Sequence, residues 1–269
     1  MNPFHVVVCA SVVPDPLQTL EPINGPSGPA LKNEMMLPAV LDPWAAHALY
    51  EGANLVKQAA GSQLWLVSMA PKAKLQQVMM TVAQKVPLQL VAVDGPCGGF
   101  VDAQQTATAL AQAIGNISGL DRSRLLLFGG WESASRSAGV TLQMVGEALG
   151  IVDQFQGVDS IRPLDDGSFE VLERVEGARH QVSLCTGPPA LLGWATGSLG
   201  EPRNDPQVGM ANMRAIMPAL QKATPAAISA NGLHYTSVAT PRQQRQTQIV
   251  KDKTADEIAR EILQWIAQE

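Results

Sequence analysis

The sequence predicts an α/β fold: a mostly parallel sheet with helices on both faces, extended by a β-hairpin and by a C-terminal arm that ends in a helix. Two observations carry this prediction. Short apolar runs alternate with longer helical segments through residues 6–149, and the connections between them are short. Beyond residue 151 the pattern changes to two alternating strands joined by a turn, and later to one amphipathic helix. Strand–helix alternation builds parallel sheets from right-handed crossovers.

The first apolar run, residues 6–10, is β-branched and ends in small residues, which is typical of a strand buried on both faces. Residues 16–40 are rich in Pro, Gly and Asn, so we expect irregular structure there. Asp42 followed by Pro43 predicts a helix start, because Asp is a good N-cap and Pro suits the first helical position. That helix should cover residues 43–59.

Strands and helices then alternate along the chain. We expect strands at 64–68, 88–93 and 125–128, and helices at 72–85, 102–117 and 137–149. The last of these strands ends in two glycines, and the last helix ends before Gly150. Strands and helices in this order predict a Rossmann-like sheet.

A β-hairpin is expected at about 169–184, because two alternating runs flank the turn signal at 176–179. A Met-rich helix should follow at about 208–221. We therefore assign residues 1–221 to one nucleotide-binding α/β domain. Residues 222–253 show no periodicity, which favours an extended segment.

The chain should close with a helix at 254–268. Thr254 and Glu257 form a capping-box pattern, and Ile258, Ile262 and Ile266 fall on one face. An apolar stripe needs a surface to cover it. We therefore interpret residues 222–269 as a C-terminal arm with a partner-docking helix.

Composition excludes several classes of protein. Charged residues make up only 16% of the 269 residues, which suggests that a partner covers part of the surface. The net charge of −5 and the lack of a basic cluster argue against nucleic acid as a ligand. The three cysteines show no CxxC spacing, so we expect neither a metal site nor a disulfide framework. Without a signal peptide or an apolar stretch of about 18 residues, we expect a cytoplasmic protein with no stable membrane insertion.

No catalytic constellation is evident, so we expect no catalytic residues and no enzymatic activity of the chain's own. The sequence lacks GxSxG, HExxH, a P-loop, and a GxGxxG after the first strand. Its four histidines are dispersed. Cys9 could be a reactive thiol at a strand end, although a small buried residue is the simpler interpretation.

Small residues at three strand ends are the best candidates for a binding site, because open parallel sheets bind ligands at the carboxyl ends of their strands. The segments are 9–11, 68–70 and 129–139. The last segment enters a helix whose first amides could hold a phosphate. Its serines could add hydroxyl donors and Arg136 a positive charge. An ordinary capped loop is the alternative.

Several of these segments resemble the β subunit of electron transfer flavoproteins, especially its Fix-type branch. The resemblance covers nearly the whole chain, with its motifs in the family's order. The matching segments are 13–15, 41–44, 127–139, 171–177, 199–203 and 240–243. Three features depart from the family pattern. The loop after residue 130 is rich in Ser, where the family has Asp, Asn and Gln. Asp42 stands where the family usually has Asn, and Ser11 stands where it has Lys.

The resemblance implies a heterodimeric electron carrier rather than an enzyme. It would pass electrons from a flavin dehydrogenase to a quinone or other acceptor. The partner α subunit would hold the redox FAD, and this chain would hold AMP or a second FAD. The implied cofactor contacts are Cys9, Ala10, Asp42, Pro43, Trp44, Ala45, Met69, Gly129, Gly130, Ser133, Ser135, Arg136, Ser137 and Ala138. The implied partner-binding residues are Leu199, Glu201 and Arg203, with Leu199 as the dehydrogenase anchor.

Two other classes of function stay open. The first is an adenine-nucleotide-binding regulatory module related to universal stress proteins, which use a similar sheet. That interpretation leaves the hairpin, the loop around Leu199 and the arm unexplained. The second is a hydrolase or ligase of adenylates, which the missing phosphate-binding glycine pattern argues against.

Overall fold

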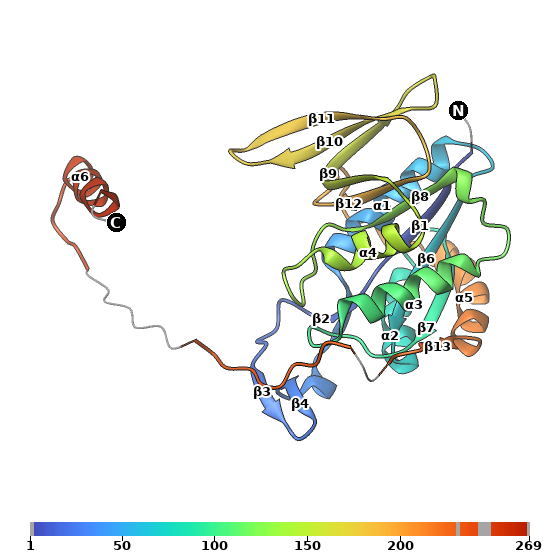
Figure 1. Cartoon of the computed structure of the whole chain (residues 1–269), viewed down its shortest axis with the longest axis horizontal. Coiled ribbons are helices and arrows are strands. Elements are labelled where there is room, and N and C mark those ends of the chain that lie inside the picture. The colour runs from blue at the N-terminus through green and yellow to red at the C-terminus, as the bar shows by residue number, and fades with distance from the viewer. Residues whose placement is uncertain (1–2, 230–231, 242–248, 268–269) are drawn as a thin grey trace. The chain divides into compact units, whose positions relative to one another are not determined.

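The computed structural model describes residues 3–229, 232–241 and 249–267. It divides into two compact units, Met1–Val238 and Ala239–Glu269. The predicted fold class is confirmed: in the described residues, nine strands form one mostly parallel, Rossmann-like sheet with helices on both faces (Figure 1). The strands, in their order across the sheet, are β11 (Arg179–Cys185), β10 (Phe169–Val175), β9 (Asp153–Pro163), β12 (Ala190–Trp194), β8 (Leu125–Gly130), β1 (His5–Cys9), β6 (Gln63–Ala70), β7 (Gln89–Asp94) and β13 (Thr224–Pro225).

Strand β1 lies in the middle of this sheet, between β6 and β8, and is parallel to both. Its side chains alternate between the two faces. Val6 and Val8 pack in one apolar cluster, and Val7 and Cys9 pack in the other. Both faces are therefore buried, which is why this strand reads as a continuous apolar run.

Helices from different parts of the chain cover the two faces. The cluster that contains Val6 includes side chains of α1 (Pro43–Gln58), α2 (Lys72–Val82) and α5 (Pro206–Gln221). The cluster that contains Val7 includes side chains of α3 (Ala103–Gly115) and α4 (Val140–Ala148). Helices α1 to α4 follow strands as the alternation predicts, and α5 lies where the Met-rich helix is expected.

Residues 16–40 are more regular than predicted. Strands β3 (Pro22–Gly25) and β4 (Gly28–Leu31) form a small hairpin, and the 3-10 helix η1 (Glu34–Met36) follows it. Strand β5 (Ala39–Leu41) then pairs with β2 (Val12–Pro14). These strands contain Pro and Gly and bury few side chains, so periodicity could not identify them.

Two further elements differ from the sequence-based expectation. Strand β9 was not predicted, since its polar residues at Asp153, Gln154 and Gln156 mask the strand pattern. It is held by β12 on one side and β10 on the other. Helix α4 begins at Val140 rather than at 137. Ser137 has φ 51°, a left-handed conformation that cannot continue a right-handed helix.

The predicted hairpin is confirmed as β10 and β11, which pair antiparallel from Phe169–Cys185 to Val175–Arg179. Its turn uses Gly177 at φ 73° and Ala178 at φ 55°. The paired strands extend the sheet beyond its parallel part (Figure 1).

The first compact unit continues past residue 222, where the sequence places the start of the arm. Strand β13 pairs with β7, and Asn24 exchanges two hydrogen bonds with the backbone of Val238. The second unit contains α6 (Ala255–Ile266), which has the expected capping box between Thr254 and Glu257. None of the described residues of α6 is buried, and Ile266 is among its exposed apolar side chains.

Asn212 joins helix α5 to the segment between α2 and β7. It is 6% exposed, its Nδ2 donates to the carbonyls of Ala83 and Val86, and its Oδ1 accepts from the N–H of Leu88. Asn212→Ala leaves these buried groups without that partner. We expect the free energy of unfolding to fall by roughly 2–4 kcal/mol.

Urea unfolding followed by circular dichroism measures this loss. Gln207→Ala on the exposed side of the same helix is the control, with an expected change of about 0.5 kcal/mol or less. Equal stabilities for the two variants would contradict the role given to Asn212.

Candidate functional site

A pocket lies at the carboxyl ends of β1, β6 and β8, where an open parallel sheet is expected to bind a ligand. Its volume is about 110 Å³. A water molecule needs about 10–15 Å³ on this measure, so the pocket has room for on the order of eight waters. Ser11 and Ala138 on its lining are exposed, so the pocket opens to solvent there. A ligand as large as a nucleotide would fill it and extend through this opening.

The pocket brings together ten of the fourteen residues that the sequence analysis assigned to a cofactor. They are Cys9, Ala10, Asp42, Ala45, Met69, Gly130, Ser133, Ser135, Arg136 and Ala138. Four others do not line it: Pro43, Trp44, Gly129 and Ser137. Trp44 and Ser137 still shape the site, because Trp44 packs directly beneath Gly130 and Ser137 turns the chain before α4.

Sequence reasoning missed other residues of the lining. Pro96, Cys97 and Gly98 follow β7, so the same rule about strand ends could have identified them. Thr106 and Leu110 of α3 contribute a wall from the helix. No local signal marks those two residues, because only the packing of α3 on the sheet brings them to the pocket.

Asp42 is the most deeply buried charged group on the lining, at 1% exposed. Its Oδ1 accepts the N–H of Trp44 at 3.1 Å. Its Oδ2 accepts the N–H of Ala134 at 2.9 Å, the hydroxyl of Ser133 at 3.0 Å and the hydroxyl of Ser11 at 3.4 Å. Four donors occupy about all the acceptor positions of a carboxylate. Asp42 therefore joins the end of β1, the start of α1 and the loop after β8.

Burial raises the pKa of Asp42 above its usual 3.8, and the four hydrogen bonds oppose this rise only in part. Burial also raises the pKa of the Cys9 thiol to about 12. Cys9 is therefore protonated at neutral pH and is a poor nucleophile. Cys9 can therefore contribute contacts to the pocket but not a thiolate.

The loop between β8 and α4 is shaped by close backbone contacts. A side chain at Gly139 would overlap the carbonyl oxygen of Trp131, so only glycine fits at this position. Gly139 is also the N-cap of α4 and provides no side-chain cap. Thr141 and Leu142 in the first turn of α4 line the pocket, so this helix N-terminus is part of the site.

Arg136 is the one Lys or Arg side chain among the described residues that line the pocket. Its Nη1 donates to the carbonyl of Val101 at 2.9 Å, which fixes the guanidinium over the pocket wall. The other charged groups on the lining are the carboxylates of Asp42 and Glu132. The described lining therefore carries one cationic side chain and two carboxylates.

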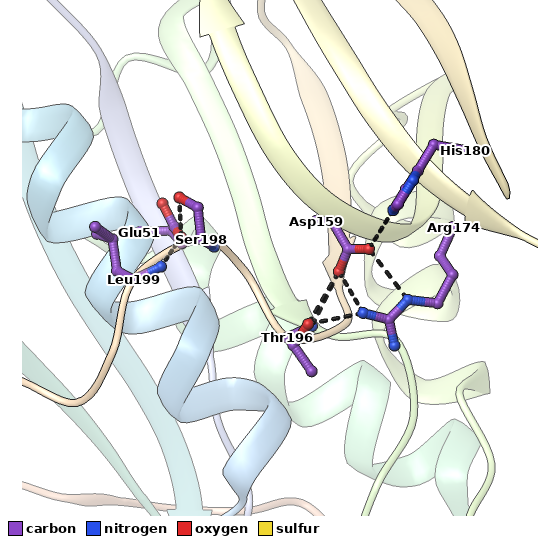
Figure 2. Close-up of polar contacts among 7 residues, drawn as sticks. All are labelled: Glu51, Asp159, Arg174, His180, Thr196, Ser198 and Leu199. Atoms are coloured by element: carbon purple, nitrogen blue, oxygen red, sulfur yellow. Dashed lines mark hydrogen bonds and ion pairs between the residues drawn. The ribbon is translucent and has the colours of Figure 1, made fainter. Parts of the chain in front are cut away.

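The loop that contains Leu199 donates hydrogen bonds to the carboxylate of Glu51 in α1 (Figure 2). Glu51 is 8% exposed, and its Oε1 accepts the N–H of Ser198 at 2.5 Å, its hydroxyl at 2.9 Å and the N–H of Leu199 at 2.9 Å. Gly197 adopts φ 66°, which aims these successive N–H groups at one oxygen. The Leu199 side chain is half-buried.

A second carboxylate, Asp159 of β9, ties the same loop to the hairpin (Figure 2). Arg174 donates to both of its oxygens, at 2.8 and 3.1 Å, and His180 Nε2 lies 2.9 Å from Oδ2. Thr196 donates its hydroxyl to Asp159 at 3.1 Å. Burial raises the pKa of Asp159, but these hydrogen bonds outweigh it and lower the pKa overall.

The remaining candidate partner contacts lie further along this loop. Glu201 pairs with Lys85 at 2.5 Å, and Lys85 also donates to the carbonyl of Pro202 at 3.3 Å. Arg203 is exposed. Leu199, Glu201 and Arg203 therefore belong to one surface loop whose backbone is fixed at several points.

A second hollow of about 430 Å³ lies beside β7, β13 and α3. It is larger, but none of the described residues that line it is charged, and it is not at the strand ends. We therefore give it less weight as a functional site. No group of His, Cys, Asp or Glu in the described part of the chain could hold a metal ion.

Among the described helices, none has both the length and the apolar character that crossing a membrane requires. Comparison with protein-family models and with curated proteins returns no match for this chain.

The raised pKa of Asp42 predicts a pH dependence of stability. The folded state binds the Asp42 proton more tightly than the unfolded state, so the stabilisation linked to that proton is complete below about pH 4. It is lost as the pH rises through the folded-state pKa. Asp42→Asn cannot titrate. The difference in unfolding free energy, wild type minus variant, should therefore fall as the pH rises above about 4.

Urea unfolding at several pH values measures this difference. A flat profile for Asp42→Asn would contradict the raised pKa.

Proposed function

We propose that this chain is the β subunit of a heterodimeric electron transfer flavoprotein. In this role it binds AMP or a second FAD in the pocket at the strand ends. A partner α subunit makes most of the contacts with the redox FAD. The complex passes electrons in the cytoplasm from a flavin dehydrogenase to a quinone or other acceptor. The chain itself performs no chemistry.

The observation that carries the proposal is the convergence of three separate strand ends on one pocket. Cys9, Met69 and Gly130 lie far apart in the sequence and line the same cavity. An apolar wall, loop donors, a fixed guanidinium at Arg136 and the N-terminus of α4 are the features expected around a nucleotide. The protonated Cys9 and the fully bonded Asp42 fit a binding role rather than catalysis.

Two further features support a role in a complex. The loop at Leu199 is fixed from two sides by buried or partly buried carboxylates, which would present a preformed contact to a partner. Helix α6 carries apolar side chains that no described residue of its own unit covers, among them Leu263 and Trp265. An apolar helix face of this kind is typical of a docking element.

The alternative is an adenine-nucleotide-binding regulatory module of the universal-stress type. The pocket by itself fits this alternative equally well. The fixed loop and the apolar face of α6 favour the β-subunit function. A regulatory module that acts alone needs neither a preformed loop for a partner nor an exposed apolar helix face. A yellow complex with a second chain after purification would separate the two functions.

The nucleotide is tested by mass spectrometry of the small molecules released when the purified complex is denatured. For each copy of this chain, the wild type should release about one equivalent of AMP, or a second equivalent of FAD beside that of the α subunit. Arg136→Ala removes a charge-assisted contact worth about 1.5–3 kcal/mol, which corresponds to roughly tenfold to hundredfold weaker binding. The variant should therefore lose its nucleotide during gel filtration.

Arg162→Ala is the matched control, because Arg162 pairs with Glu170 on the exposed surface of the hairpin region and should leave the nucleotide in place. A wild-type complex that contains no nucleotide would refute the proposed ligand.

The docking role of Leu199 gives a second test. Leu199→Ala removes an apolar anchor but leaves the backbone bond from its N–H to Glu51 intact. Loss of such an anchor costs about 1.5–3 kcal/mol of binding free energy. The KM of the dehydrogenase for the complex should therefore rise roughly tenfold to hundredfold. Flavin content and melting temperature should change little.

The measurement is the rate of flavin reduction at limiting dehydrogenase. Leu184→Ala on β11 is the control, since this leucine is 66% exposed and lies outside the loop. A similar rise in KM for both variants, or a large loss of stability in Leu199→Ala, would show that Leu199 is not a docking residue.

A further inference from the structure

Asp42 occupies the groups in the pocket that would otherwise hold a phosphate. Loop amides and hydroxyls after a parallel strand are common phosphate ligands, as is a helix N-terminus. Here the hydroxyls of Ser11 and Ser133, which line the pocket, donate to one internal carboxylate. The same carboxylate accepts the N–H groups of Ala134 and Trp44 beside the pocket. A ligand phosphate could use them only by displacing Asp42.

The charges around the pocket act in the same direction. Among the described lining residues, Arg136 is the one side chain that can neutralise a ligand phosphate, and it stands against Asp42 and Glu132. Asp42 is 1% exposed, so water screens its charge poorly. Each further phosphate group on a ligand therefore adds repulsion that no second cation offsets.

We propose that Asp42 is the specificity residue that limits the number of phosphate charges in this pocket. This inference rests on the proposed function and concerns the same site. Asp42 fills the phosphate-binding donors of the Ser-rich loop with the protein's own carboxylate. The ligand's anionic part is directed to Arg136 and the first turn of α4, and its uncharged part lies against the apolar wall. The pocket then accepts AMP or the diester pyrophosphate of FAD and rejects ADP and ATP.

A purely structural role for Asp42 makes a different prediction. If Asp42 served only to cap α1 and to hold the loop, its replacement would weaken every nucleotide by the same factor. If Asp42 selects ligands by their number of phosphate charges, its replacement changes the ratio of the dissociation constants of different nucleotides. The ratio of dissociation constants for ATP and AMP therefore separates the two roles.

The experiment is isothermal titration calorimetry of the full chain with adenosine, AMP, ADP, ATP and FAD. In the wild type, ATP should bind at least tenfold more weakly than AMP. Asp42→Asn should reduce this ATP-to-AMP ratio at least tenfold. Glu132→Gln is the matched control, because it removes one negative charge from the lining without releasing the donors held by Asp42. It should change the ratio less than Asp42→Asn does.

Asp42→Ser is a second variant in case the asparagine does not fold, since Ser is a good N-cap and can accept the N–H of Trp44. Equal wild-type affinities for AMP and ATP would overturn the inference while leaving the proposed nucleotide site intact. An unchanged ratio in the Asp42 variants, or an equal change in Glu132→Gln, would also overturn it. A wild type that binds none of the five ligands would refute the proposed nucleotide site itself.

Discussion

Helix α1 holds two loops in place through carboxylates that it buries. Asp42 at its N-cap accepts from the loop between β8 and α4, and Glu51 two turns later accepts from the loop that contains Leu199. Both carboxylates are buried, and a buried charge is costly unless hydrogen-bond donors satisfy it, so each carboxylate requires the N–H groups of its loop. The candidate pocket and the candidate docking loop therefore depend on the same helix and on the same kind of interaction.

This arrangement also determines what chemistry the pocket can perform. The four hydrogen bonds that Asp42 accepts orient its carboxylate toward the protein's own loops. The thiol of Cys9 lies in the apolar cluster between the sheet and α3, which keeps it protonated. The lining also carries the Arg136 guanidinium, the Glu132 carboxylate, the N-terminus of α4 and an apolar wall. Those groups can hold and orient a ligand, as the proposed binding role requires.

Much of the fold was predictable because its local and tertiary preferences agree. The run at β1 is apolar on both faces since both faces are covered, and Asp42 with Pro43 marks the start of α1 in the sequence as it does in the structure. Strand β9 shows the opposite case. Its polar side chains carry no strand signal, and its pairing with β12 and β10 alone makes it a strand.

The sequence by itself determined the parallel sheet, the strand ends that converge on the pocket, and Asp42 as a helix cap. It could not determine which groups satisfy that carboxylate, because Ser133 and Ala134 lie more than 90 positions away. The same holds for Glu51, which looks like an ordinary helical residue and meets the Leu199 loop at a separation of 148 positions. Hydrogen bonds between distant segments leave no periodic trace in the chain. Only the tertiary structure decided that both loops are anchored on α1, since the carboxylates buried there require hydrogen-bond donors.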